Sequence, residues 1–90
     1  ISEGITDFLE QTRNIILQND YTNFEEAIST ANQLINSLAQ LKRAELKRIQ
    51  GQTGSLKVSM VYLTMIQEAQ NVVAYTSNLL KVSRKFQVEE

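Results

Sequence analysis

The sequence predicts an all-α fold, an antiparallel three-helix bundle with up-down-up topology. Three observations support this prediction. Apolar residues recur every three or four positions along most of the chain, which is the spacing of one face of an α-helix. The 90 residues include no proline and only three glycines, so few residues interrupt a helix. The periodic segments are joined by short connections, and short connections make successive helices antiparallel neighbours.

The first helix is expected to begin with Ser2 as its N-cap and to end near Asn19. At ~1.5 Å per residue it spans roughly 27 Å. The residues on its apolar face are Ile5, Phe8, Leu9, Thr12, Ile15 and Ile16.

The second helix is expected to begin at Thr22, because Thr22 and Glu25 have the spacing of a capping box. It closes at the turn Gly51-Gln52-Thr53-Gly54, in which two glycines are free to take positive φ. The stripe between these points comprises Phe24, Ala27, Ile28, Ala31, Leu34, Ile35, Leu38, Leu41, Leu46 and Ile49.

The third helix is expected to start at about Ser55 and to be apolar on two sides. So broad an apolar surface indicates contact with neighbours on both sides. One side carries Leu56, Met60, Leu63, Ile66, Val73 and Leu80, and the other carries Val61, Met65, Ala69, Val72, Thr76, Leu79 and Phe86.

The first helix is too short to cover the other two, which reach roughly 40 to 45 Å at ~1.5 Å per residue. Leu46, Ile49, Leu56 and Met60 beside the Gly51 turn are therefore expected to form an interface. Its occupant is a second subunit, an upstream part of the chain or another partner. The alternative is an ordinary, slightly exposed bundle tip.

Charged residues gather at the predicted helix ends, and the antiparallel arrangement brings opposite charges towards one another. We interpret both clusters as solvated helix ends that complement the helix dipoles. Glu3, Asp7 and Glu10 are expected to face Lys42 and Arg43, and Asp20, Glu25 and Glu26 to face Lys81, Arg84 and Lys85.

Composition excludes several classes of chemistry. Without cysteine or histidine there is no disulfide, thiolate nucleophile, zinc-thiolate site or histidine base. The net charge of −1 gives no overall basic field for nucleic acid, and the longest apolar stretches are shorter than a membrane span. The glycine turn lacks the lysine register of a phosphate-binding loop. We therefore expect no catalysis, no nucleic-acid partner and no membrane insertion by this segment.

Polar residues occupy the middle of the third helix, at Gln67, Glu68, Gln70 and Asn71. Buried amides persist only when they are hydrogen-bonded. These side chains therefore face solvent, face polar groups of another helix, or descend from a polar site. Periodicity alone favours exposure of Glu68 and Asn71.

The third helix resembles the C-terminal helix of PhoU-like domains. In that family a leucine-glutamate-arginine-x-x-aspartate segment supplies carboxylates for metal, and Ile66-Gln67-Glu68-Ala69-Gln70-Asn71 occupies the matching place. The resemblance implies that Gln67 stands for the glutamate and Asn71 for the aspartate. Both changes keep shape and remove charge, so we expect a vestigial site without metal or cofactor. Restoring both carboxylates is expected to recover affinity for a multivalent cation if a partner carboxylate lies nearby.

The resemblance implies a regulatory or accessory domain of a phosphate transport protein, such as a bacterial sodium/phosphate cotransporter, acting by helix-face interactions. Residues 1–90 are expected to form one such domain, excised from a longer protein because the chain begins at Ile1. Its partners are then a second copy or the membrane domain of the same chain, on the cytoplasmic side of the inner membrane. The alternative is a generic helical-bundle adaptor or dimerisation module. A metal-dependent enzyme using Glu68 with Asp7 or Glu10 is disfavoured, because Asp7 lies opposite the apolar face of its helix.

Overall fold

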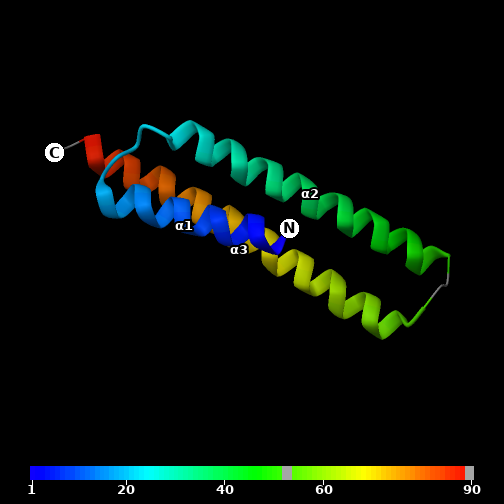
Figure 1. Cartoon of the computed structure of the whole chain (residues 1–90). Helices are drawn as coiled ribbons and strands as arrows, with labels where there is room; N and C mark the ends of the chain where they lie inside the picture. Colours follow the sequence, from blue (N-terminus) through cyan, green and yellow to red (C-terminus); the bar gives the residue numbers. More distant parts are fainter. Residues whose placement is uncertain (52–53, 89–90) are drawn as a thin grey trace.

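The computed structural model describes residues 1–51 and 54–88, which form three α-helices and, within these ranges, no strand. They are α1 (Ser2–Gln18), α2 (Phe24–Gln50) and α3 (Leu56–Val88), and they run up, down and up in an elongated body of 56 × 18 × 17 Å (Figure 1). The predicted all-α fold and its three helices are confirmed. None of the described helices is both long and apolar enough to cross a lipid bilayer.

The end of α1 was predicted correctly, but its start was not. Ser2 is the first helical residue and Ile1 is the N-cap, so the predicted Ser2 cap is wrong. At the other end Asn19 adopts a left-handed conformation, with φ 53°, and its amide donates to the Ile16 carbonyl. Asparagine is one of the few residues that takes this conformation readily, so it stops the helix where the sequence indicated.

The predicted capping box at Thr22 is also wrong, because Thr22 bonds backwards to Asp20. Its hydroxyl donates to Asp20 Oδ1 at 2.6 Å, and its backbone amide donates to the same oxygen at 3.1 Å. These hydrogen bonds lower the pKa of Asp20. The N-cap of α2 is Asn23, whose side chain makes no capping bond, and α2 starts at Phe24. The local turn is more favourable for Thr22 than the helix cap.

Only one glycine of the second turn uses positive φ. Gly51 keeps a right-handed helical conformation, and its amide donates to the Lys47 carbonyl at 2.9 Å. Gly54 has φ +80°, a conformation that glycine adopts without strain. Gln52 and Thr53, between them, lie outside the described residues.

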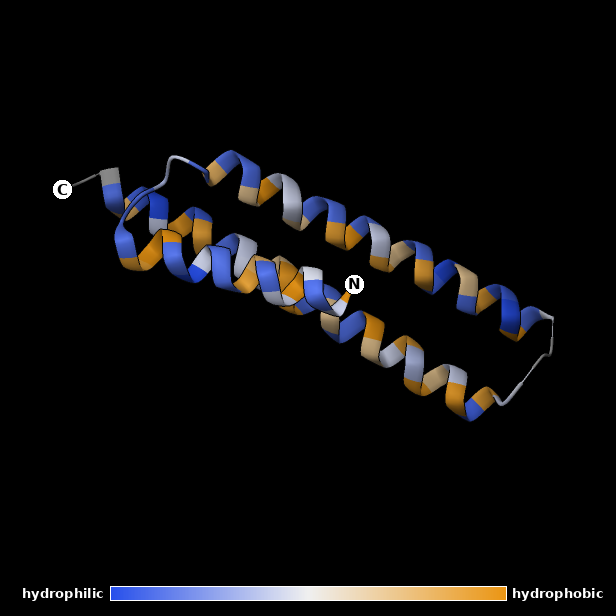
Figure 2. Cartoon of the chain, in the orientation of Figure 1, coloured by the Kyte–Doolittle hydropathy of each residue, from blue (hydrophilic) through white to orange (hydrophobic). Residues whose placement is uncertain are grey.

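The apolar core lies in the half of the molecule where all three helices run together. One cluster contains Ile15, Phe24, Ala27 and Leu80, and a second contains Phe8, Ala31 and Val73. Phe8, at the centre of α1, is only 1% exposed. Alanines on α2 let the helices approach closely around these larger side chains. Figure 2 shows that hydrophobic and hydrophilic residues alternate along all three helices.

Beyond the start of α1, helices α2 and α3 continue as a two-helix hairpin, as Figure 1 shows. Ile1 and Ile5 lie near Leu38, Leu41 and Ile66, so α1 reaches no further along the bundle than this level. We call residues 42–50 and 56–64 the hairpin extension. The predicted mismatch between helix lengths is therefore present. It leaves one part of the chain with two helices instead of three.

Candidate functional site

A buried polar contact joins the two helices of the hairpin extension. It takes the place that apolar side chains have in the three-helix part. Glu45 on α2 is only 5% exposed. The hydroxyl of Ser59, buried on α3, donates to Glu45 Oε2 at 2.5 Å, and Arg48 donates to Glu45 Oε1 at 2.6 Å. Both carboxylate oxygens thus have partners, as a buried charge requires. This contact joins α2 to α3 without the help of α1.

A second polar contact lies at the boundary between the hairpin extension and the three-helix part. The Lys42 ammonium donates to Gln67 Oε1 at 2.8 Å and to Gln70 Oε1 at 3.1 Å. Gln70 Nε2 donates in turn to the Ile35 carbonyl at 3.3 Å. Lys42 therefore bridges α2 to the polar centre of α3, and no ion pair joins it to Glu3, Asp7 or Glu10 in the described residues.

Some polar side chains in the middle of α3 thus bond to α2, and others face solvent. Gln67 and Asn71 are exposed and bonded to each other, Gln67 Nε2 donating to Asn71 Oδ1 at 3.0 Å. Gln70 is half-buried, and Glu68 is exposed. The two residues that the PhoU-like resemblance singled out are neighbours in space. The cation beside them is the ammonium of Lys42.

No group of three or more acidic side chains in residues 1–51 and 54–88 is arranged to hold a metal ion. Asp7, Glu10 and Glu68 are all exposed. Lys42 also places a positive charge at Gln67, and that charge opposes binding of another cation there.

The largest exposed apolar surface follows the outer side of α3. Nine positions alternate in steps of three and four residues over 29 residues, which is the heptad spacing of a coiled-coil seam. Eight are apolar and exposed, from 45% at Val72 to 73% at Tyr75, and the ninth is exposed Glu68. This outer seam consists of Val58, Val61, Met65, Glu68, Val72, Tyr75, Leu79, Val82 and Phe86.

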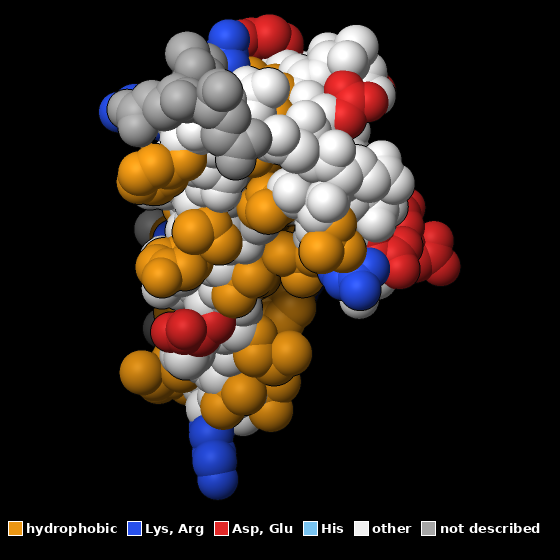
Figure 3. Space-filling view, turned by 90° about the vertical axis from the view of Figure 1, so that its left-hand side faces the viewer, with side chains coloured by type: hydrophobic (Ala, Val, Ile, Leu, Met, Phe, Trp, Pro, Cys, Tyr) orange, Lys and Arg blue, Asp and Glu red, His pale blue; other side chains and the backbone are white. Residues whose placement is uncertain are grey.

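The inner side of α3 has the same repeat, shifted by one residue. Ser59, Ile66, Val73 and Leu80 follow one another at intervals of seven residues, and all four are buried. α3 therefore has two seams with one period, of which α1 and α2 cover only the inner one. Figure 3 looks at the molecule from the left-hand end of Figure 1, and hydrophobic side chains gather through the middle and lower part of that view.

The interface residues predicted from helix lengths lie at the far end of the molecule. Leu46, Leu56 and Met60 are exposed, and Ile49 is half-buried. Met60 is a neighbour in sequence of Val61 in the outer seam. The self-association predicted at this end stays a prediction.

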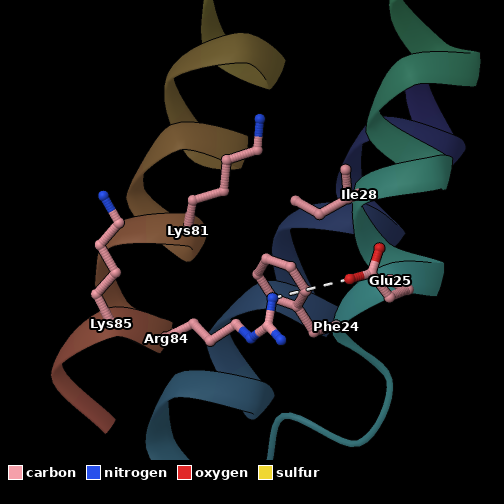
Figure 4. A pocket seen from close by; sticks show the side chains of 6 residues that line it. All are labelled: Phe24, Glu25, Ile28, Lys81, Arg84 and Lys85. Carbon is pink, nitrogen blue, oxygen red and sulfur yellow. Dashed lines mark ion pairs between the residues drawn. The ribbon is translucent and has the colours of Figure 1, made fainter. Parts of the chain in front are cut away.

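An open groove of about 500 Å³ lies at the opposite end, between the start of α2 and the end of α3 (Figure 4). Arg84 reaches across it, with its guanidinium 4.3 Å from the centre of the Phe24 ring and 3.8 Å from Glu25 Oε1. One pair of the predicted charge cluster is therefore present. Lys81 and Lys85 line the α3 side and are exposed. Exposed pairs of this kind contribute little to stability.

Helical periodicity predicted some residues of the outer seam but not its full heptad spacing. Val61, Met65, Val72, Leu79 and Phe86 were expected on a second apolar side, and all are exposed. Val58, Tyr75 and Val82 were not included. The alternation of three and four residues from Val58 to Phe86 is the signal that identifies the complete set.

No protein-family model, curated protein or solved structure matches the chain.

The buried contact in the hairpin extension gives a stability prediction. Ser59→Ala leaves a buried carboxylate oxygen of Glu45 without its donor, so we expect a loss of about 1–3 kcal/mol in the free energy of unfolding. Adding Glu45→Leu removes the buried charge, and we expect the double variant to recover most of that loss. Urea denaturation measures both. Ser37→Ala, exposed on α2, is the control and should change stability by no more than about 0.5 kcal/mol. A double variant less stable than Ser59→Ala would contradict this account.

The ammonium of Lys42 alters the metal affinity expected when carboxylates are introduced at positions 67 and 71. In Gln67→Glu with Asn71→Asp, the carboxylate introduced at position 67 lies beside the Lys42 ammonium, which neutralises it. We therefore expect no measurable Mn²⁺ affinity until Lys42→Ala is added, after which two carboxylates bind the ion weakly, with Kd on the order of millimolar. Isothermal titration calorimetry with Mn²⁺ distinguishes the variants. Equal Mn²⁺ affinity with and without Lys42 would show that its charge does not control this site.

Proposed function

We propose that this chain is a non-catalytic accessory or regulatory domain that works through contacts of its helix faces. The single observation that carries the proposal is the outer seam of α3. Eight exposed apolar side chains in register along one helix are unfavourable in water, and such surfaces mark sites of interaction. The constant spacing along four heptads favours a helix as the binding partner.

The biological setting in this proposal is a phosphate transport protein. The support is the resemblance of Ile66–Asn71 to the polar segment of PhoU-like domains, together with the three-helix architecture. In this setting the domain lies on the cytoplasmic side of the inner membrane, tethered by the rest of its protein. Association and dissociation of the outer seam would shift the transporter between two conformations, provided that the seam binds one of them more tightly.

A generic helical adaptor is the second candidate. The outer seam supports it equally, because a helix-binding surface serves any protein to which the domain is attached. The two candidates differ in what happens when the seam is damaged. Only the first links the seam to phosphate movement.

Phosphate uptake tests the proposal. We expect Val72→Glu with Tyr75→Glu, made in the full-length gene product, to change the initial rate of radiolabelled phosphate uptake by about tenfold or more, because two charges in the seam prevent an apolar contact. The assay uses bacterial cells that lack other phosphate transporters. Leu17→Glu, a matched change at an exposed leucine of α1, should leave the rate within about twofold.

Immunoblotting checks that the variants and the unaltered protein are present in equal amounts. Uptake that is the same for both variants and for the unaltered protein would contradict the regulatory role. A gene product that moves no phosphate would favour the adaptor.

A further inference from the structure

We propose that the outer seam of α3 binds the outer seam of a second copy of this chain, as an antiparallel two-stranded coiled coil. The inference rests on the proposed function in one respect: both use the outer seam as the contact surface. It adds the identity of the partner and the orientation of the two helices.

The spacing of the seam indicates a helical occupant. Steps of three and four residues give a mean period of 3.5, which keeps a stripe facing one partner along a left-handed supercoil. The pattern persists from Val58 to Phe86 with one polar member, Glu68. A lipid surface requires only a broad apolar face, whereas a narrow stripe of constant period is what a second helix requires.

The size of the surface is sufficient for a stable dimer. With 45% to 73% of each apolar side chain exposed, the seven residues from Val58 to Val82 present on the order of 700 Å² per chain, which is close to one partner's share of a standard protein interface. Burying this surface removes the largest run of exposed apolar side chains from water.

The residues that flank the seam favour a copy of the same chain. Coiled coils that select a different partner usually do so with charges beside the seam. Here the flanking positions from 62 to 83 carry no charge, and only the two ends of the seam are flanked by charge, at Lys57 and Lys85. The uncharged positions are Tyr62, Thr64, Ala69, Asn71, Thr76, Asn78 and Ser83. A two-fold dimer also requires the same surface on both members, and a straight seam meets that requirement.

Glu68 determines the orientation. In a parallel dimer in register, Glu68 lies opposite Glu68 of the other copy, and two carboxylates meet in an apolar interface. Antiparallel packing places each Glu68 opposite Val72 instead, where its carboxylate can reach solvent at the edge of the seam. The dipoles of two antiparallel helices also oppose one another favourably.

The antiparallel register that places Glu68 opposite Val72 also aligns the seam from Val58 to Val82 and leaves Phe86 beyond the paired region. This register has a two-fold axis at position 70, and the two members of each facing pair are equally far from it along the helix. Val58 therefore lies opposite Val82, Val61 opposite Leu79, and Met65 opposite Tyr75. At ~1.5 Å per residue the paired region from 58 to 82 is about 36 Å long. The hairpin extension of one copy then lies beside the three-helix part of the other.

Sedimentation equilibrium of the whole 90-residue chain tests the dimer. We expect a reversible dimer at tens of micromolar, about tenfold weaker or more in Val72→Glu with Tyr75→Glu, and about tenfold tighter in Glu68→Leu, which completes the apolar seam. Leu17→Glu is the matched control, since Leu17 is an exposed leucine of α1 outside both the seam and the predicted interface. It should change the dissociation constant by no more than about threefold.

Circular dichroism checks that each variant keeps its helix content. A chain that stays monomeric at millimolar concentration overturns the proposal. So does a dimer that Met60→Glu disrupts and the seam variant does not, because that result assigns association to the predicted interface at Leu46, Ile49, Leu56 and Met60. Binding of a monomeric chain to anionic lipid vesicles would assign the seam to a membrane surface and would also overturn the proposal.

Orientation is tested by disulfide formation, for which the natural absence of cysteine is an advantage. We expect Val58→Cys chains to form few covalent dimers alone and to cross-link efficiently with Val82→Cys chains under mild oxidation, because cross-linking requires Cα atoms within about 7 Å. Efficient cross-linking of Val58→Cys alone would establish a parallel dimer and overturn the antiparallel arrangement.

The two proposals fail separately. If the seam variant is monomeric but phosphate uptake is unchanged, the dimer stands and the regulatory function fails. If the unaltered chain is monomeric but uptake depends on the seam, the function stands and the seam binds a different surface.

Discussion

The whole structure depends on the packing of α3 against α2, because among the described helices this pair alone continues along the full length of the bundle. Ile66, Val73 and Leu80 on the inner seam supply the apolar contacts at intervals of seven residues. α1 adds Phe8 and Ile15 to one half of that seam. One helix therefore organises the bundle, and the side chains of its second seam are exposed in the part of the chain that the structure describes.

The change from an apolar core to polar contacts occurs where α1 stops. Two packed helices cannot enclose an apolar core as three can, and the buried residues of the hairpin extension are the polar Glu45 and Ser59. Lys42 and Glu45 suit this position, because their charged ends hydrogen-bond to polar side chains of α3. The same contacts fix how α2 and α3 align. They thereby hold the outer seam in a defined position relative to the rest of the molecule.

Periodicity was sufficient to predict the three helices and the positions at which the first two end. It was sufficient for the start of α3, expected at about Ser55 and observed at Leu56, but not for the starts of α1 and α2. At α2, Thr22 had two possible hydrogen-bond partners and bonds to the nearer one, Asp20. Periodicity also could not determine which side of α3 is covered, since both sides are apolar with the same period and the answer depends on where α1 lies. The partner of Gln67 was hidden for a similar reason: the reach of Lys42 across 25 residues of sequence is a property of the packed helices.

The central claim is that the outer seam of α3 is the binding surface of this domain and that a second copy occupies it. The most direct measurement follows the backbone amide resonances of the unaltered chain by NMR while the protein is diluted from about 1 mM to about 20 µM, a range in which a weak dimer dissociates. The account predicts that concentration-dependent shifts concentrate on α3 between residues 58 and 82, strongest around Val72, with little change for Phe8 and Ile15. Shifts confined to the Gly51 end of the hairpin extension, or no shifts at all, would contradict it.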